Sequence, residues 1–454
     1  MAETLTYRAH AAKLMVLGLP LVGAYVASFA IHTTDVLMLG WYGISELAAA
    51  TVASSVYFVV YVVGSGFGYA VTPLVAEAVE QGDDVRARRV TRMALWLSAL
   101  FAVFGLLILW PAKTTMLLIG QTPEVAVLSQ DYLRIAAFGM FPALGIQVMR
   151  SLLGAWLLTA VQLWITLLAL AANAALNWAL IFGNFGMPEM GIKGAAVASV
   201  VIQMLQFLLL AAYAHAKRPD YAMFQRLWRP DFPAMAQVFR LGVPIGVTGL
   251  AESGLFAASS VMMGWIGKIE LAAHGIALQL TAMTFMFHLG MSQAATIRAG
   301  GQYGRRDEAA LRRGGVAAYA VAIGFGALVV AVFLAIPGPL VSLFIDRTDP
   351  ARDMLLQVGV TLIILSALFQ FMDSTQVVAL SLLRGVQDTT VPMWLAAISY
   401  WGIGVPASYV MAFTWGMGPT GLWLGLTVGL ACAALSLGWR FWRVSSHIAP
   451  KPGV

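Results

Sequence analysis

Long apolar stretches recur along the whole chain and are separated by short polar segments. We count twelve stretches of roughly 20 residues or more, each long enough for a helix that rises 1.5 Å per residue to cross a hydrocarbon core about 30 Å thick. Their approximate centres are Val26, Val63, Phe101, Gly139, Ala171, Phe207, Leu250, Phe285, Phe325, Ser366, Ile403 and Val428. The pattern predicts an all-α integral membrane protein with twelve transmembrane helices.

The composition supports a lipid environment. Of 454 residues, 60% are hydrophobic and only 11% are charged, whereas soluble proteins carry about 25% charged residues. The single cysteine, Cys432, excludes a disulfide framework within the chain. The N-terminal apolar stretch continues well beyond the length of a signal peptide, so we interpret it as a retained first membrane helix.

Basic residues are distributed unevenly between the loops. If the segments alternate in direction and the N-terminus is inside, 21 Lys and Arg residues fall in inner loops and ends, and five or six fall outside. A bias of this size in short loops sets membrane orientation. We therefore expect a multi-pass protein of the bacterial cytoplasmic (inner) membrane with both termini cytoplasmic. Scattered loop charges fit this topology better than nucleic-acid binding.

The chain contains an internal repeat. The stretch from Gly18 to Ala49 aligns without gaps with Gly242 to Ala273, at an offset of 224, and 11 of 32 positions are identical. Weaker similarity continues further along each half. We therefore predict two parallel six-helix lobes, residues 1–216 and 237–454, joined by a cytoplasmic linker, 217–236, that is long enough to swing. Such repeats support alternating access, although a duplicated architecture can also be purely structural.

Three acidic residues lie deep inside predicted helices: Asp35, Glu252 and Asp373. An ionised side chain at the membrane centre costs roughly 2.5–3.5 kcal/mol on insertion scales, and such residues usually face a cavity or a partner. We find no basic residue inside a segment that could neutralise them. A protonated acid that is hydrogen-bonded to a neighbour remains the structural alternative.

The two lobes present their first acid differently. In the repeat alignment Asp35 corresponds to Ser259, and Glu252 corresponds to Ser28. The two acids are thus offset by two helical turns and lie on nearly the same face of the first helix of each lobe. We expect one acid per first helix, at different depths.

Neutral oxygen donors accompany these acids. Asn173 and Asn177 are spaced i, i+4 on one helix face, and Gln376 lies close to Asp373 in the sequence. Carboxylate and amide oxygens suit Na⁺ or a proton-bearing network, because hard cations prefer oxygen ligands. A carboxyl group in this setting can hold a proton or a cation, but not both well, which is the simplest physical basis for antiport.

Other side chains are weaker candidates. His32 precedes Asp35 by about one turn and could share its proton, although a structural helix histidine is the more common case. Phe369 precedes Asp373 by one turn and is a candidate for stacking in a substrate cavity. No G-x-x-x-x-G-K-[ST] motif occurs, and we find no convincing nucleophile–His–acid set, so we do not expect an enzyme.

Taken together, these residues resemble the multidrug and toxic compound extrusion (MATE) family over essentially the whole chain. The matching stretches are "TTDVLMLGW", "NAALNWALIFG", "LAESGLF" and "MDSTQVVALSLLRGVQDTTVPMW". The Glu in the seventh segment and the Asp in the tenth are most similar to the NorM branch. The first-lobe loop "GAWLLTAVQLW" lacks the Gly and Pro pattern that the second-lobe loop "RGVQDTTVPMW" keeps. Asn177 is a second departure, because another branch of the family has Asp at this position.

The resemblance implies a V-shaped pair of six-helix bundles that exports organic cations in exchange for Na⁺ or H⁺. It places a first-lobe ion or proton site at Asp35, Asn173 and Asn177, with Ser199 as a weaker candidate. Glu252 and Asp373 would form a second-lobe cation site, with Na⁺ as its tentative metal ion. We expect no cofactor beyond the coupling ion, a monomer in contact with membrane lipids, and no nucleic-acid partner. The alternatives are a flippase for a lipid-linked envelope precursor, or an ion channel or receptor.

Overall fold

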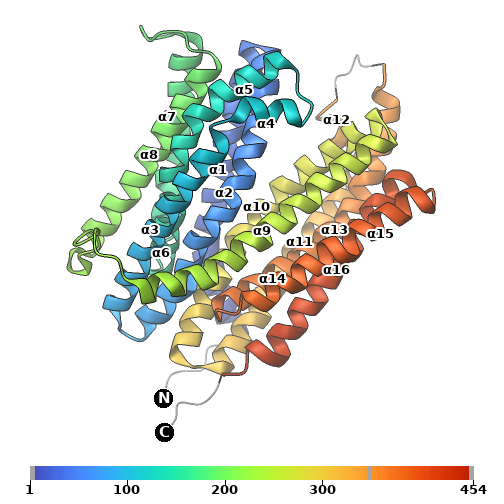
Figure 1. The fold of residues 1–454 in the computed structure, drawn as a ribbon. Coiled ribbons are helices and arrows are strands. Elements are labelled where there is room, and N and C mark those ends of the chain that lie inside the picture. Colours follow the sequence, from blue (N-terminus) through green and yellow to red (C-terminus); the bar gives the residue numbers. More distant parts are fainter. Residues whose placement is uncertain (1–5, 346–349, 449–454) are drawn as a thin grey trace. The chain divides into compact units, whose positions relative to one another are not determined.

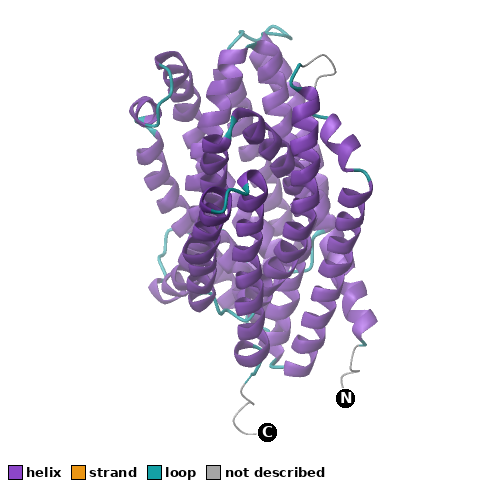
Figure 2. Cartoon of the chain, turned by 90° about the vertical axis from the view of Figure 1, so that its right-hand side faces the viewer, coloured by secondary structure: helices purple, strands orange, loops and turns teal. Residues whose placement is uncertain are grey.

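The computed structural model describes residues 6–345 and 350–448, and every regular element in these two ranges is helical (Figures 1 and 2). The elements in chain order are α1 (Tyr7–Tyr42), α2 (Ile44–Glu80), α3 (Asp84–Leu109), α4 (Ala112–Leu118), α5 (Pro123–Ala136), η1 (Ala137–Gly139), α6 (Met140–Ala155), α7 (Ala160–Phe182), α8 (Ile192–Lys217), η2 (Pro219–Tyr221), α9 (Phe232–Ile266), α10 (Lys268–Arg305), α11 (Glu308–Ala335), α12 (Pro337–Ser342), α13 (Arg352–Gly385), α14 (Thr390–Ala397), η3 (Ile398–Gly404), α15 (Val405–Tyr409), η4 (Val410–Thr414), α16 (Gly418–Arg440) and η5 (Phe441–Ser445).

Twelve helical segments of the described ranges are long and apolar enough to cross a membrane. Each predicted centre falls in a different segment, so the predicted all-α fold with twelve spans is confirmed. Three spans combine several elements: Pro123–Ala155, Thr390–Thr414 and Gly418–Ser445. The hydrophobic pattern did not predict the short helices α4 and α12, because six or seven residues are too few to form a membrane-length stretch.

The chain divides into two compact units. Unit 1 comprises Met1–Val22 and Thr248–Val454, and unit 2 comprises Gly23–Val247. The division falls inside α1 and α9 rather than at the expected linker. The first part of α1 therefore belongs to unit 1, and the first part of α9 belongs to unit 2.

Apolar side chains at the start of these two helices are buried in the unit to which they are assigned. Leu14 and Leu21 of α1 join the hydrophobic core of unit 1. Val238, Leu241 and Ile245 of α9 join a core of unit 2. Each unit thus gains part of its core from a helix that continues into the other unit.

Glycines allow these helix starts to pack closely. In unit 2, a Cβ atom on Gly66 of α2 would overlap the carbonyl oxygen of Gly242 and lie 2.6 Å from the nitrogen of Gly246 in α9. In unit 1, a Cβ atom on Gly290 of α10 would overlap the backbone nitrogen of Val22 in α1. Gly66 and Gly290 are equivalent in the repeat, so the same close helix contact is built twice.

Local backbone features repeat as well. Asp83 caps the start of α3 and Asp307 caps the start of α11, each side chain accepting a hydrogen bond from the backbone N–H three residues on. Leu157 and Gln387 both adopt a left-handed conformation, with φ of 61° and 63°, in the loops after α6 and α13. The halves share turns and caps, not only apolar lengths.

Unit 2 holds the segment between α8 and α9 through side chains of α3. Arg92 donates from Nε to the carbonyl oxygen of Met223 at 2.7 Å, and Trp96 donates from Nε1 to that of Leu227 at 2.7 Å. These bonds tie the segment between α8 and α9 to α3, and the swinging motion expected of 217–236 stays a prediction. Backbone carbonyl groups of the segment accept these hydrogen bonds, which its composition did not indicate.

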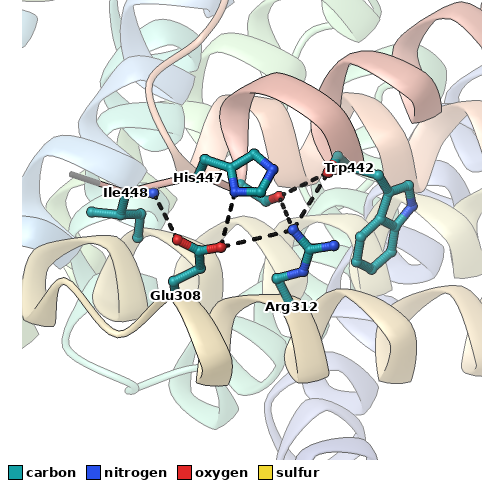
Figure 3. A network of polar contacts seen from close by, with 6 residues as sticks. Glu308, Arg312, Trp442, His447 and Ile448 are labelled. Carbon is teal, nitrogen blue, oxygen red and sulfur yellow. Dashed lines mark hydrogen bonds and ion pairs between the residues drawn. The ribbon is translucent and has the colours of Figure 1, made fainter. Parts of the chain in front are cut away.

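Unit 1 binds the segment after α16 in a related way (Figure 3). The Nη1 atom of Arg312 in α11 lies 3.5 Å from the carbonyl oxygen of Trp442. Glu308 accepts a hydrogen bond from the backbone N–H of Ile448 at 3.1 Å and lies 3.1 Å from Nδ1 of His447. In both units the third long helix thus fixes the chain that leaves the last helix.

Candidate functional site

In unit 2, Asp35 of α1 lies at the centre of a polar cluster. Asn177 of α7 donates from Nδ2 to Asp35 Oδ1 at 2.6 Å, and Ser199 of α8 donates to Asp35 Oδ2 at 3.2 Å. The same Asn177 nitrogen also donates to Asn173 Oδ1 at 3.2 Å. Both asparagines are fully buried. The structure therefore brings together the four residues that were expected to form a first-lobe site.

Close packing of α7 and α8 makes this cluster possible. A Cβ atom on Gly194 of α8 would overlap the carbonyl oxygen of Leu180 in α7. Only glycine permits this approach. It places Ser199, just over one turn further along α8, beside the Asp35 carboxylate.

Two amide atoms of this cluster have no hydrogen-bond partner among the described residues. Asn173 Nδ2 and Asn177 Oδ1 are buried without a hydrogen-bond partner in the described part of the chain. The hydroxyl group of Tyr132 in α5 lies close to Asp35 and Ser199. An acceptor oxygen beside a carboxylate suits a bound cation or a shared proton. Sequence reasoning missed Tyr132, because no spacing pattern relates a tyrosine of α5 to an acid of α1.

His32 lies one turn before Asp35 on α1, and its side chain is exposed. It is close enough to Asp35 to interact with it electrostatically. No hydrogen bond to a protein group is formed by His32 within the described ranges. The structure thus places His32 at the edge of the cluster.

In unit 1, Glu252 of α9 and Asp373 of α13 interact electrostatically with each other. Glu252 is partly buried, whereas Asp373 is buried and its Oδ1 atom has no hydrogen-bond partner among the described residues. Both acids lie close to the hydroxyl group of Tyr400 in η3, which is also buried without a partner there. The two predicted acids therefore share one polar region, and Tyr400 is an addition that the sequence did not indicate.

A hydrogen bond positions Tyr400 relative to α9. The indole of the adjacent Trp401 donates from Nε1 to the carbonyl oxygen of Ala251 at 3.0 Å. Ala251 directly precedes Glu252 in the chain. The π-helical turn of η3 is thus held against α9 at the acid.

Two further candidates on α13 are placed differently from each other. Gln376 is fully buried, and neither of its amide atoms has a hydrogen-bond partner in the described ranges. Phe369 packs edge-on against Phe256 and Trp423, with ring centroids 5.9 and 5.4 Å away. Phe369 has no exposed surface, so the expectation that it lines a substrate cavity does not fit this structure.

One expectation about charge must be corrected. We predicted that no basic side chain accompanies the acids, yet Arg384 interacts electrostatically with Glu252. Arg384 lies three turns beyond Asp373 on the same face of α13, which places it within reach. Within the described ranges, however, no ion pair joins Asp35, Glu252 or Asp373 to a basic side chain.

A duplicated set of membrane helices with acids in both units is the arrangement of a polytopic transporter, and comparisons with known proteins define its family. The family model named MatE matches residues 20–179 and again residues 244–410. The predicted internal repeat is thereby confirmed. The chain belongs to the MatE family, which is a family of membrane transporters. The predicted family and the prediction of a transporter rather than an enzyme are confirmed.

Individual relatives agree with this assignment. The chain is 43% identical to "Probable multidrug resistance protein NorM" of Rhizobium meliloti (strain 1021), over 98% of this chain and 95% of that protein. It is 34% identical to the protein of the same name from Synechocystis sp., over 96% of this chain and 95% of that protein. The predicted similarity to the NorM branch is confirmed.

Solved structures show the same fold. A crystal structure of MATE in complex with MaL6 has a TM-score of 0.87 at 20% identity and covers 96% of this chain and 97% of its own. A crystal structure of a eukaryotic MATE transporter has a TM-score of 0.85 at 19% identity. The match covers 97% of this chain and 98% of that chain. At these identities the likeness establishes the fold of a multi-pass membrane protein and nothing about ligands.

Proposed function

We propose that this chain is a secondary antiporter that exports cationic amphipathic compounds in exchange for Na⁺ or H⁺. The observation that carries the proposal is that Asp35, Glu252 and Asp373 lie inside membrane helices without an ion pair in the described ranges, next to neutral oxygen and phenol groups. Acids of this kind mark ion or substrate pathways. Relatives named as multidrug resistance proteins support export of several compounds.

The proposed coupling rests on competition at these carboxyl groups. In unit 2, Na⁺ would be held by Asp35 and by the amide oxygens of Asn173 and Asn177, or a proton would sit on Asp35. In unit 1, the Glu252 and Asp373 pair would take the second positive species. Because one carboxylate cannot hold an ion and a cationic guest equally well, arrival of the ion releases the guest.

We further propose that the protein lies in the bacterial inner membrane with both termini cytoplasmic. The support is the excess of Lys and Arg in the loops that this orientation places inside. Export would then move substrates away from the cytoplasm.

Ethidium efflux from proteoliposomes tests the proposal. Purified protein is reconstituted, and efflux is driven separately by a Na⁺ gradient and by a pH gradient. We expect efflux with at least one gradient, and strong loss of efflux in Asp35→Asn, Glu252→Gln and Asp373→Asn. Asp220→Asn, at an exposed position, is the matched control. Wild-type efflux in all three membrane variants would refute the proposal.

A flippase for a lipid-linked anionic precursor is the second candidate. The observation that favours it is an arginine, Arg150, inside the fourth membrane span. A single arginine provides little positive charge to bind a diphosphate. The three acids in the membrane helices would repel such an anionic substrate. Translocation of a fluorescent lipid-linked diphosphate by the same proteoliposomes, without ethidium efflux, would favour the flippase.

A further inference from the structure

Two arginines of α3 in unit 2 are fixed by the backbone of the segment between α8 and α9. Arg88 donates from Nη1 to the carbonyl oxygen of Tyr221 at 3.3 Å. Arg92 lies one turn further on, on the same helix face. It donates from Nη2 to the carbonyl oxygen of Ala222 at 2.8 Å and from Nε to that of Met223 at 2.7 Å. Three successive carbonyl groups thus hold two guanidinium groups side by side.

A third arginine, Arg226, belongs to the same cluster. Both Arg88 and Arg226 interact electrostatically with Arg92. The side chain of Arg226 is exposed and forms no hydrogen bond within the described ranges. Backbone carbonyl groups position guanidinium groups but do not cancel their charge, and like charges repel. We call these three residues the arginine triad.

The acids next to the triad are engaged by other arginines. Asp84 Oδ1 lies 3.9 Å from Nη1 of Arg218, and Asp231 forms an ion pair with Arg89. Among the described residues, no ion pair joins an acid to any member of the triad. The triad therefore carries positive charge that the neighbouring side chains do not balance.

The triad also has hydrogen-bond donors to spare. An arginine carries five N–H donors, and Arg88 Nε is buried without an acceptor in the described part of the chain. The planar guanidinium fork of Arg226 is open to solvent. Arginine forks match the oxygen atoms of phosphate groups in geometry and in charge. Spare donors and unbalanced charge at one place together indicate a phosphate-bearing partner.

Unit 1 lacks this arrangement at the equivalent place. Arg312 is the repeat equivalent of Arg88, and its Nη1 atom lies 3.8 Å from Oε1 of Glu308 (Figure 3). The repeat equivalent of Arg92 is Val316. Unit 1 therefore balances its one arginine with an acid, and the excess of charge is a feature of unit 2.

Exposed aromatic side chains place the triad at a membrane interface. Trp228 is 76% exposed and Phe232 is 71% exposed, and they follow Arg226 closely in the chain. Arg88 and Phe232 lie at the starts of the spans Asp84–Leu109 and Phe232–Ile266. Aromatic side chains at the ends of spans lie at the level of the lipid headgroups. Basic residues beside them are typical of surfaces that bind anionic lipids.

We propose that the arginine triad binds the phosphate headgroup of an anionic phospholipid, with Trp228 and Phe232 against the upper part of its acyl chains. The lipid would supply the negative charge that unit 1 obtains from Glu308. It would also hold the segment between α8 and α9 to the membrane surface. The inference adds a lipid partner to the proposed function and places it in the leaflet that faces the cytoplasm in the proposed orientation.

Photochemical labelling with two phospholipids tests the proposal. The purified full chain is placed in nanodiscs that contain phosphatidylglycerol or phosphatidylcholine with a diazirine next to the headgroup, and labelled peptides are identified by mass spectrometry. We expect phosphatidylglycerol to label residues 217–236 at least about fivefold more than phosphatidylcholine does. Arg226→Gln should lower the phosphatidylglycerol label there about fivefold, which is the effect of one basic residue beside an anionic surface. The matched control Arg312→Gln should leave that label within about twofold.

Three results overturn the inference. They are equal labelling of this segment by the two lipids, an unchanged phosphatidylglycerol label in Arg226→Gln, and an equal loss of label in Arg226→Gln and Arg312→Gln. An excess of inorganic phosphate that removes the label would show a site for free phosphate and would overturn the lipid assignment. If Arg226→Gln does not fold, the comparison of the two lipids on the wild type decides. Labelling needs no ion gradient, so its outcome is independent of the efflux assay that tests the antiporter.

Discussion

Asn177 donates a hydrogen bond of 2.6 Å to the carboxylate of Asp35, joining α7 to α1 inside unit 2. The same amide nitrogen reaches Asn173, so one side chain organises two oxygen-bearing neighbours. Hydrogen bonds to charged groups contribute about 1.5–3 kcal/mol. The geometry of the unit 2 cluster therefore depends strongly on Asn177.

We predict that Asn177→Ala lowers the ethidium efflux rate at a fixed ion gradient by about tenfold, because 1.4 kcal/mol corresponds to a factor of ten. The reason is loss of both the bond to Asp35 and a buried amide oxygen. Asn184→Ala, which removes an exposed bond to the Trp178 carbonyl, is the control and should retain efflux. Equal rates in the two variants would contradict a coupling role for Asn177.

We predict that Gly290→Ala destabilises the protein, because the new methyl group would overlap the backbone of Val22. Overpacking of this kind costs about 1–3 kcal/mol. Gly275→Ala, in the same helix but with nothing within 4 Å of the added atom, should leave stability unchanged or slightly higher. Thermal unfolding of the purified variants measures both effects, and a stable Gly290→Ala would argue against the close contact.

Asp388→Asn should lower the unfolding free energy by about 1.5–3 kcal/mol, as for other hydrogen bonds to charged groups. Arg440 donates to both oxygens of Asp388, at 2.6 and 3.1 Å, and both side chains are largely buried. Lys193→Gln tests a single, more exposed contact to Asp131 and should change stability by less than about 1 kcal/mol. If the two variants unfold at the same temperature, the bidentate pair is not a specific stabiliser.

The ion pair between Arg89 and Asp231 should act equally at pH 5 and pH 8. The hydrogen bond from Arg89 holds the pKa of Asp231 below its ordinary value of 3.8. The pair's contribution is therefore complete above about pH 4 and is lost only as the pH falls through the lowered pKa. Arg89 is half exposed, so we expect Arg89→Gln to cost under about 1 kcal/mol at both pH values. Thermal unfolding at the two pH values checks this, with Lys217→Gln as the control, and an effect at only one pH would contradict it.

Most of the fold could be predicted because lipid imposes simple rules on sequence. A membrane span needs a long apolar helix, so the twelve segments follow from length and composition. The repeat was visible in identities such as Gly18 and Gly242. The division inside α1 and α9 was not predictable. It depends on which backbone segments Gly66 and Gly290 contact, and the residue spacing within one helix does not show which other helix packs against it.

The candidate site was partly predictable for a related reason. Asn173 and Asn177 share a helix face, so their association follows from i, i+4 spacing. Tyr132 and Tyr400 lie on other helices than the acids they approach, and only the packed structure brings them near. Arg150 of α6 contacts Ser28 of α1, and this contact between two helices also required three-dimensional information.

The assignment of the start of α9 to unit 2 limits how this protein can be dissected. A fragment that ends within the segment 217–231 would lack Val238, Leu241 and Ile245, which belong to the core of unit 2, and would leave Gly66 without its neighbouring backbone. A fragment that begins there would likewise lack Leu14 and Leu21. Neither sequence half is therefore a self-sufficient folding unit: each must borrow a stretch of helix from the other to complete its interior.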